Sequence, residues 1–432
     1  MEIMSKIKEL LRNKTIKNAK WMVAEQLVQM GINVILGVLT ARYLGPSNYG
    51  VINYTAAFVI FFSNVVTLGL EAVSIKEMVN NRDDDSTVVG TGIGLRLMAG
   101  TLSTGIIFVL LFVLKDGNPL VLKVGFLQSL VMIFKAFELI DYWFQSKLQS
   151  KYVAILKSVS YVFVAAYKFY ILFAGKSVAW FAFSTSLDFL LIAVMIVIAY
   201  FAKGGRRLRF SWNMAKRLVS QGYHFMISGL IITIYVQMDK IMLGQMMTEA
   251  DVGLYSAATV ISNYWLLIPV AIINAVRPTI MEIKKEGNEE LYIKRLKQLY
   301  AILIWVGIAV STVISVSSKL ILDILYDTVY LSASVALAVV IWYTTFSTLG
   351  TARGVWIVCE NKNKYTGRLV FWGVILNFIL NYLLIPIMGI NGAALATLIT
   401  QIFTSIITPL FYKETRINTK YIIDAFLLRG IR

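Results

Sequence analysis

Long apolar stretches alternate with short polar breaks along almost the whole chain. Crossing the hydrocarbon core of a bilayer takes about 20 residues of α-helix. Twelve stretches meet that length, and each predicts one membrane-spanning helix. They cover residues 21–43, 49–73, 89–114, 120–145, 153–174, 178–201, 218–245, 252–281, 298–317, 332–357, 366–387 and 391–412. The breaks are too short for a soluble domain, so we predict an all-α integral membrane protein.

A basic break near the middle of the chain, residues 203–217, predicts the domain organisation. We interpret it as a cytoplasmic linker between two six-helix lobes, residues 21–202 and 218–412, with a cytoplasmic tail at 413–432. A weak repeat supports this division. Leu44-Gly45 is followed by Tyr54-Thr55-Ala56-Ala57, and Leu243-Gly244 is followed by Tyr255-Ser256-Ala257-Ala258. Two such lobes would be repeats of the same orientation, related by an axis along the membrane normal.

Lysine and arginine are distributed unevenly around these spans. If the N-terminus is cytoplasmic, the cytoplasmic segments and adjoining span ends hold 30 of the 41, and the outer segments hold five. Cytoplasmic loops carry the excess of basic residues, so both termini are predicted to be cytoplasmic. The net charge of +17 is therefore mainly a topology signal and does not indicate nucleic acid. Basic and apolar side chains at helical spacing in residues 1–20 predict an interfacial helix on the cytoplasmic leaflet.

Composition agrees with a membrane protein and excludes several classes of enzyme. The chain is 58% hydrophobic and 15% charged, with a mean hydropathy of +0.71, whereas soluble domains are about 25% charged. Cys359 and His224 are each the only residue of their kind. This excludes a disulfide framework, a zinc cluster of the usual spacing and a two-histidine metal site. No P-loop pattern occurs, and we predict neither an enzyme nor a cofactor.

Polar side chains inside the spans are the main functional signal, because a charged group at the bilayer centre costs a few kcal/mol unless it faces protein or water. At about 100° per residue, they form stripes on the first two spans of each lobe. The stripes include Glu25, Asn33, Asn64, Glu71, Tyr235 and Asp239. Hydrogen bonding between packed helices would explain any one stripe. Long stripes on all four spans favour a polar central cavity between the lobes.

Charged residues within the spans are candidates for cargo binding and ion coupling. Lys135 and Asp188 lie near mid-membrane, although Lys135 could simply pair with Glu138. Basic groups favour phosphate or carboxylate through charge-assisted hydrogen bonds. The predicted substrate-binding residues are Lys135, Lys168, Arg277, Arg96, Arg353, Asn33, Asn64 and Tyr235, and the ion-coupling candidates are Glu71, Asp239, Glu25 and Asp188. Six basic residues against six acidic ones within the spans leave both anionic and cationic cargo open.

Six short sequence segments carry a resemblance to a known family. Residues 41–50 read ARYLGPSNYG, 69–71 read GLE, 141–145 read DYWFQ, 239–244 read DKIMLG, 252–256 read VGLYS and 389–394 read GINGAA. Their order and spacing resemble the Wzx-type polysaccharide flippases, bacterial O-antigen and repeat-unit transporters of the multidrug/oligosaccharidyl-lipid/polysaccharide exporter superfamily. The likeness covers almost the whole chain. Glycine and proline in these strings suit tight turns, so the motif residues are predicted to be scaffold rather than binding site.

The resemblance implies a function. A flippase of this kind moves an undecaprenyl-diphosphate-linked oligosaccharide, such as an O-antigen repeat unit in lipopolysaccharide biosynthesis, to the outer leaflet of the cell inner membrane. The lobes would rock in alternating access, leaving the polyprenyl tail in lipid through a side opening. Glu71 or Asp239 could couple a proton or sodium ion. Polysaccharide polymerase and chain-length machinery are expected partners. The alternatives are a cation-coupled drug or small-molecule exporter of the same superfamily, and a lipid II flippase, for which fourteen spans are expected.

Overall fold

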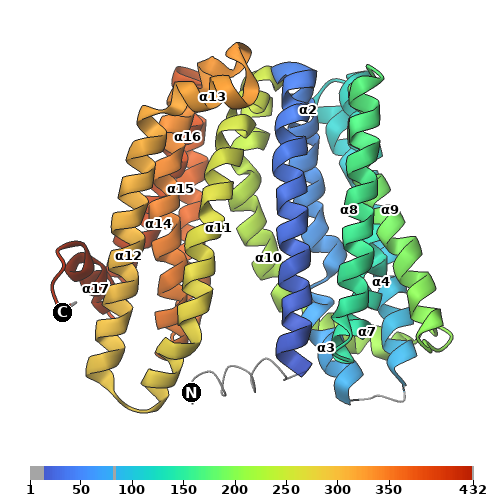
Figure 1. Ribbon diagram of the computed structural model, residues 1–432, viewed down its shortest axis with the longest axis horizontal. Helices are drawn as coiled ribbons and strands as arrows, with labels where there is room; N and C mark the ends of the chain where they lie inside the picture. Colours follow the sequence, from blue (N-terminus) through green and yellow to red (C-terminus); the bar gives the residue numbers. More distant parts are fainter. Residues whose placement is uncertain (1–13, 81–83, 431–432) are drawn as a thin grey trace, which may run out of the picture. The chain divides into compact units, whose positions relative to one another are not determined.

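The computed structural model describes residues 14–80 and 84–430, and these residues form helices without a strand (Figure 1). The helices of the first half are α2 (Lys14–Thr67), α3 (Leu70–Asn80), α4 (Asp85–Leu114), α5 (Pro119–Ser129), α6 (Val131–Phe134), η2 (Lys135–Phe137), α7 (Glu138–Ser146), α8 (Ser150–Phe173) and α9 (Val178–Ala202). The second half contains α10 (Trp212–Met246), α11 (Glu249–Lys285), α12 (Glu289–Val316), α13 (Ser318–Tyr326), η3 (Thr328–Ala333), α14 (Ser334–Cys359), α15 (Lys364–Met388), α16 (Ile390–Ile402), η4 (Phe403–Ile407), η5 (Thr408–Phe411) and α17 (Arg416–Phe426). The predicted interfacial helix 1–20 falls largely outside the described residues.

The number of membrane crossings follows from these helices. Within the described chain, eleven helical stretches are long and apolar enough to span a bilayer. The first of them, Val28–Asn80, contains two crossings, because Gly45 interrupts α2 with a left-handed φ of 68°. Glycine adopts this conformation without the steric cost that a Cβ would bring. The predicted all-α membrane fold with twelve crossing segments is therefore confirmed.

The chain divides into two compact units. Unit 1 contains the described residues up to Leu44 together with Thr55–Thr233, and unit 2 contains Gly45–Tyr54 together with the described residues from Ile234 onward. Helices α2 and α10 therefore contribute to both units. The basic stretch 203–217 belongs to unit 1, where the Ser211 backbone N–H donates to Thr91 Oγ1 of α4 at 3.0 Å. The lobe boundaries at 21–202 and 218–412 stay a prediction.

Unit 1 has a core of large side chains where α7 meets α4 and α9. Trp143, Leu139 and Phe144 of α7 pack there with Tyr200 of α9. The Trp143 indole N–H donates to Asp85 Oδ2 of α4 at 2.8 Å, and its ring lies 4.8 Å from that of Tyr200. An indole that is buried with its N–H satisfied packs without an uncompensated polar group. This core fixes the helices that carry the polar residues described below.

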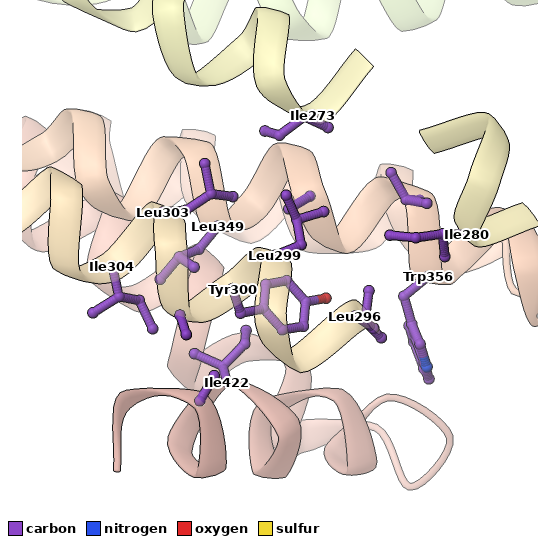
Figure 2. Close-up of a cluster of buried hydrophobic side chains, with 14 of the residues drawn as sticks. Ile273, Ile280, Leu296, Leu299, Tyr300, Leu303, Ile304, Leu349, Trp356 and Ile422 are labelled. Carbon is purple, nitrogen blue, oxygen red and sulfur yellow. The ribbon is translucent and has the colours of Figure 1, made fainter. Parts of the chain in front are cut away.

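Unit 2 is built around α14, which packs against α11, α12 and α16. Its core cluster joins α11, α12 and α14 to the C-terminal helix α17, as Figure 2 shows for Ile280, Tyr300, Leu349 and Ile422. Helix α17 lies against α12 because Ile422 is buried on it and the Asn418 amide donates to Tyr300 Oη at 2.7 Å. The segment predicted only as a cytoplasmic tail is thus a packed helix.

Two of the glycine-rich strings pack against each other within unit 2. A Cβ added to Gly253 would lie 2.0 Å from the carbonyl oxygen of Pro46, and one added to Gly50 would lie 1.6 Å from that of Glu249. Only glycine allows the two backbones to approach this closely. This contact supports the interpretation of the strings as scaffold.

Candidate functional site

A polar cavity of about 460 Å³ lies within unit 1, among α2, α3, α7, α8 and α9. Each of these helices, together with the turn η2, supplies at least one charged side chain to the lining. The charged lining residues are Glu25, Glu71, Glu138, Asp141, Asp188, Lys135 and Lys157. Charged side chains are costly inside a membrane and usually mark a substrate or ion pathway, so this cavity is the candidate functional site. The predicted cavity between the lobes stays a prediction.

Lys135 reaches the cavity from a break in its span. Helix α6 ends at Phe134, and the 3₁₀ turn η2, Lys135–Phe137, precedes α7. Such a turn within a spanning segment often marks a functional hinge. The Lys135 ammonium donates to Ser63 Oγ of α2 at 2.6 Å, whereas Glu138 pairs with Arg96 at 3.4 Å. The anticipated Lys135–Glu138 pair does not form, so Lys135 faces the cavity with a neutral partner among the described residues.

Arg96 lies behind the cavity wall rather than on it. Its side chain is fully buried, and Nη2 donates to the Thr67 carbonyl oxygen at 3.1 Å and to Tyr142 Oη at 3.4 Å. Thr67 is the last residue of α2, where backbone carbonyls lose their helical partners. Arg96 therefore stabilises the end of α2 against α7.

Arg353 of unit 2 is likewise a buried arginine that donates to backbone carbonyls. It is buried, and Nη1 donates to the carbonyl oxygens of Thr404 and Ser405 at 2.8 and 3.1 Å. Both acceptors lie in η4, a π-helical turn in which the regular hydrogen-bond pattern changes. A guanidinium that satisfies these carbonyls stabilises an irregular segment that would otherwise be costly within a bilayer.

Helix α8 forms a polar pair with each of three neighbouring helices around the cavity, α2, α9 and α7. Tyr161 Oη donates to Glu25 Oε1 at 3.1 Å, and Ser160 Oγ donates to Asp188 Oδ1 at 2.6 Å. Lys157 Nζ pairs with Asp141 Oδ2 at 2.7 Å. These contacts hold carboxylate oxygens at fixed positions around the cavity. Its lining carries five carboxylates and two ammonium groups, an acidic excess that the sequence did not predict.

Unit 2 contains a separate polar cluster around Asp239 of α10. The buried carboxylate accepts hydrogen bonds from the Tyr255 and Thr397 hydroxyls and from the Asn381 amide, the last at 2.7 Å. Asn381 also donates to Asn377 Oδ1 at 3.1 Å, while its own Oδ1 is buried without a hydrogen-bond partner. One carboxylate, two amide oxygens and two hydroxyls thus converge from α10, α11, α15 and α16, which is the oxygen-rich chemistry that hard cations prefer.

The remaining predicted residues are distributed over both units. Lys168 of α8 interacts electrostatically with Asp188 of α9. Asn64 donates to Thr233 Oγ1 in a helix contact within unit 1. The Tyr235 hydroxyl of unit 2 is buried without a hydrogen-bond partner. Asn33 and Arg277 are exposed. Their binding roles stay predictions.

Several cavity and cluster residues were absent from the predicted set. Lys157 and Tyr161 share one face of a span, and Tyr255 and Thr397 lie on polar stripes, so helical periodicity carried a signal for all four. Asn377 and Asn381 are one turn apart in span eleven, in the region of the family strings. Periodicity shows that such residues share a face, but it does not show which face meets which.

Comparison with known proteins agrees with this geometry. Residues 15–284 match the family described as polysaccharide biosynthesis protein. A candidate O-antigen transporter of Escherichia coli (strain K12) is 20% identical over 409 residues, which cover 90% of this chain and 95% of that protein.

Solved structures share the fold at low sequence identity. The lipid II flippase MurJ, in an inward closed conformation, superposes with a TM-score of 0.70 at 14% identity, covering 96% of this chain and 92% of that one. A multidrug resistance MATE transporter of the MOP superfamily, in an inward-facing conformation, gives 0.59 at 13% identity over 94% and 97% of the two chains. The family resemblance found in the sequence strings is confirmed. This multi-pass transport protein belongs to the polysaccharide biosynthesis protein family.

Proposed function

We propose that the protein is a flippase for an undecaprenyl-diphosphate-linked oligosaccharide, such as an O-antigen repeat unit. It would move this lipid from the inner to the outer leaflet of a bacterial inner membrane, with both termini cytoplasmic. The family and the flippase-like fold support this proposal. The observation that carries it is the polar cavity of unit 1, because a sugar needs polar partners within the bilayer.

The cavity lining suits a hydroxyl-rich cargo. Carboxylates such as Asp188 and Glu25 accept hydrogen bonds from sugar hydroxyls, and the amides of Gln26, Gln29 and Gln145 both donate and accept. Lys135 is the cavity cation without a carboxylate partner among the described residues, so we assign it a hydroxyl or carbonyl oxygen of the sugar. The excess of carboxylates favours neutral or amino sugars in the cavity over the diphosphate.

Transport requires the cavity to open alternately to the two sides of the membrane. We propose that the two units move relative to each other in alternating access and that Asp239 couples this movement to a monovalent cation. A single buried carboxylate with neutral oxygen neighbours supports this role. The membrane potential supplies about 2.3 kcal/mol per charge per 100 mV. Glu71, Glu25 and Asp188 are the alternative coupling groups.

A cation-coupled drug exporter is the second candidate function. It is favoured by one observation, the acidic excess of the cavity, since carboxylates in a membrane cavity also suit cationic organic molecules. The MATE-like fold is compatible with both functions, because fold alone does not decide cargo.

A complementation assay separates the two. A strain that lacks this protein is provided with the wild-type chain, and surface polysaccharide is measured together with resistance to cationic drugs. Restored polysaccharide with unchanged resistance supports the flippase. Restored resistance with no polysaccharide would refute it in favour of the exporter. Contacts with polysaccharide polymerase and chain-length machinery can be tested in the same strain by affinity purification.

A further inference from the structure

An apolar groove lies on the other side of the cavity wall. It has a volume of about 430 Å³ and runs between α2 and α8 of unit 1. Its lining is Trp21, Glu25, Val28, Ala154, Ile155, Ser158, Val159 and Val162. Val159 is 53% exposed and Val162 is 59% exposed, so the groove opens away from the protein interior toward the position of lipid.

The groove and the cavity share an edge. Glu25 of α2 and Ala154 of α8 line both of them. At about 100° per residue, Ser150, Val153, Lys157 and Tyr161 lie on one side of Ala154, and Ile155, Ser158, Val159 and Val162 lie on the other. On α2, Gln26 and Gln29 lie on the cavity side of Glu25, and Trp21 and Val28 on the groove side. The two helices therefore separate a polar compartment from an apolar one along a thin wall.

Two contacts hold α2 and α8 together on either side of this wall. The Tyr161 hydroxyl donates to Glu25, and the Lys151 ammonium lies 5.2 Å from the centroid of the Trp21 ring. Ala154, between them along α8, presents only a methyl group. Ala154 lines both the cavity and the groove, so no side chain larger than a methyl group separates the two at this position of α8.

The charges are arranged to keep a phosphate outside the cavity. The cavity carries five carboxylates against two ammonium groups, which disfavours an anion. Lys151, in the first turn of α8, places a cation beside the groove-lining Trp21. An apolar groove with a cation at one end is complementary to a lipid with an anionic head and a hydrocarbon chain.

We propose that this groove binds the polyprenyl chain of the lipid-linked substrate, with Lys151 facing the diphosphate and the sugars entering the cavity past Ala154. The proposal rests on the proposed function and assigns its side opening to the α2–α8 edge of unit 1. Chain, diphosphate and sugar then each meet a matching surface, and none of them has to enter a region of the wrong polarity.

Binding of undecaprenyl diphosphate to the full-length protein in phosphatidylcholine nanodiscs tests the site. Val159→Trp fills the groove and should weaken binding at least tenfold. Val113→Trp on α4 makes the same change at a position that is 66% exposed and outside the groove, and it should bind as wild type. Lys151→Ala should weaken binding about tenfold, and Lys151→Arg should retain it. Gel filtration and melting temperature establish that each variant is folded.

Competition and complementation complete the test. Undecaprenyl phosphate should displace the probe, whereas inorganic diphosphate and phosphatidylglycerol should not. Wild-type affinity in Val159→Trp, or displacement by phosphatidylglycerol at equal concentration, overturns the groove assignment. A wild-type chain that binds the probe but restores no surface polysaccharide contradicts the proposed function and leaves the lipid site standing. Wild-type export by Val159→Trp overturns the site alone.

Discussion

The surroundings of Lys135 favour a role in binding over a role in holding the helices together. Its ammonium contacts the neutral Ser63 hydroxyl rather than a carboxylate. Lys135→Ala should therefore reduce surface polysaccharide in the complemented strain several-fold without lowering the amount of folded protein. Lys123→Ala, at an exposed site on α5, is the matched control. Equal export by both variants would remove Lys135 from the cargo site.

Asp239 makes a different prediction, because all its hydrogen-bond donors come from neutral groups in unit 2. Asp239→Asn keeps the size of the side chain and removes its charge. Transport in proteoliposomes should then lose its dependence on a sodium or proton gradient, while the protein still folds. Asp323→Asn, at an exposed site on α13, should leave that dependence unchanged. Gradient-dependent transport by Asp239→Asn would shift the coupling role to Glu71, Glu25 or Asp188.

At this scale the sequence predicts candidates better than it predicts roles. The helical stripes identified Glu25 and Glu71, and their depth in the membrane identified Asp188 and Lys135; all four line the cavity. Arg96 was predicted as a basic residue within a span and yet lies behind the wall. Its position depends on the carbonyl left free at Thr67 and on Glu138 of another span. These partners are distant in sequence, so periodicity within one helix could not reveal them.

At the scale of helices, the apolar stretches located most span ends to within a few residues, although the helix predicted from 298 begins at Glu289. They did not locate the internal breaks. The span predicted at 49–73 is divided at Leu68 and Gly69, whose φ values of 51° and 63° separate α2 from α3. Likewise, the 3₁₀ turn at Lys135–Phe137 and the π-helical turn at Phe403–Ile407 lie inside predicted spans. Hydropathy records only how apolar a segment is. Breaks depend on tertiary partners that satisfy the freed backbone groups.

The glycine contact in unit 2 gives a prediction about stability. Gly253→Ala places a methyl group 2.0 Å from the Pro46 carbonyl oxygen, and the backbones must separate to accept it. Overpacking of this kind costs about 1–3 kcal/mol, so the melting temperature in detergent should fall by several degrees. Gly105→Ala on α4 is the matched change, because its methyl group would meet no atom within 4 Å. Similar melting temperatures for the two variants would show that the α2–α11 contact is not a close one.

At the scale of the whole molecule, the distribution of basic residues predicts which loops face the cytoplasm. With Cys359 replaced by alanine, Asp116→Cys in the α4–α5 turn should react with a membrane-impermeant thiol reagent on intact spheroplasts. Glu286→Cys in the α11–α12 turn should react only after the membrane is opened. Both sites are exposed, so access should depend only on the side of the membrane. The reverse pattern would invert the predicted topology.

The sequence also predicted the twelve crossing segments and the family. Long apolar stretches predict the crossings, and short local strings carry the family resemblance. It could not predict how the polar residues divide between two compact units, with a charged cavity in one and the Asp239 cluster in the other. The stripes show that polar faces exist on several spans. Their grouping is decided by packing between helices far apart along the chain.

The position of Arg96 behind the cavity wall has a consequence for how the cargo of such a protein can change. Arg96 braces the end of α2 through Thr67, Tyr142 and Glu138, whereas Gln26 and Gln29 face the cavity and take no part in these contacts. Substitutions away from core, caps and paired charges usually change stability by less than about 0.5 kcal/mol. Lining residues outside these contacts, such as Gln26 and Gln29, can therefore change between related chains while the bracing of α2 is kept.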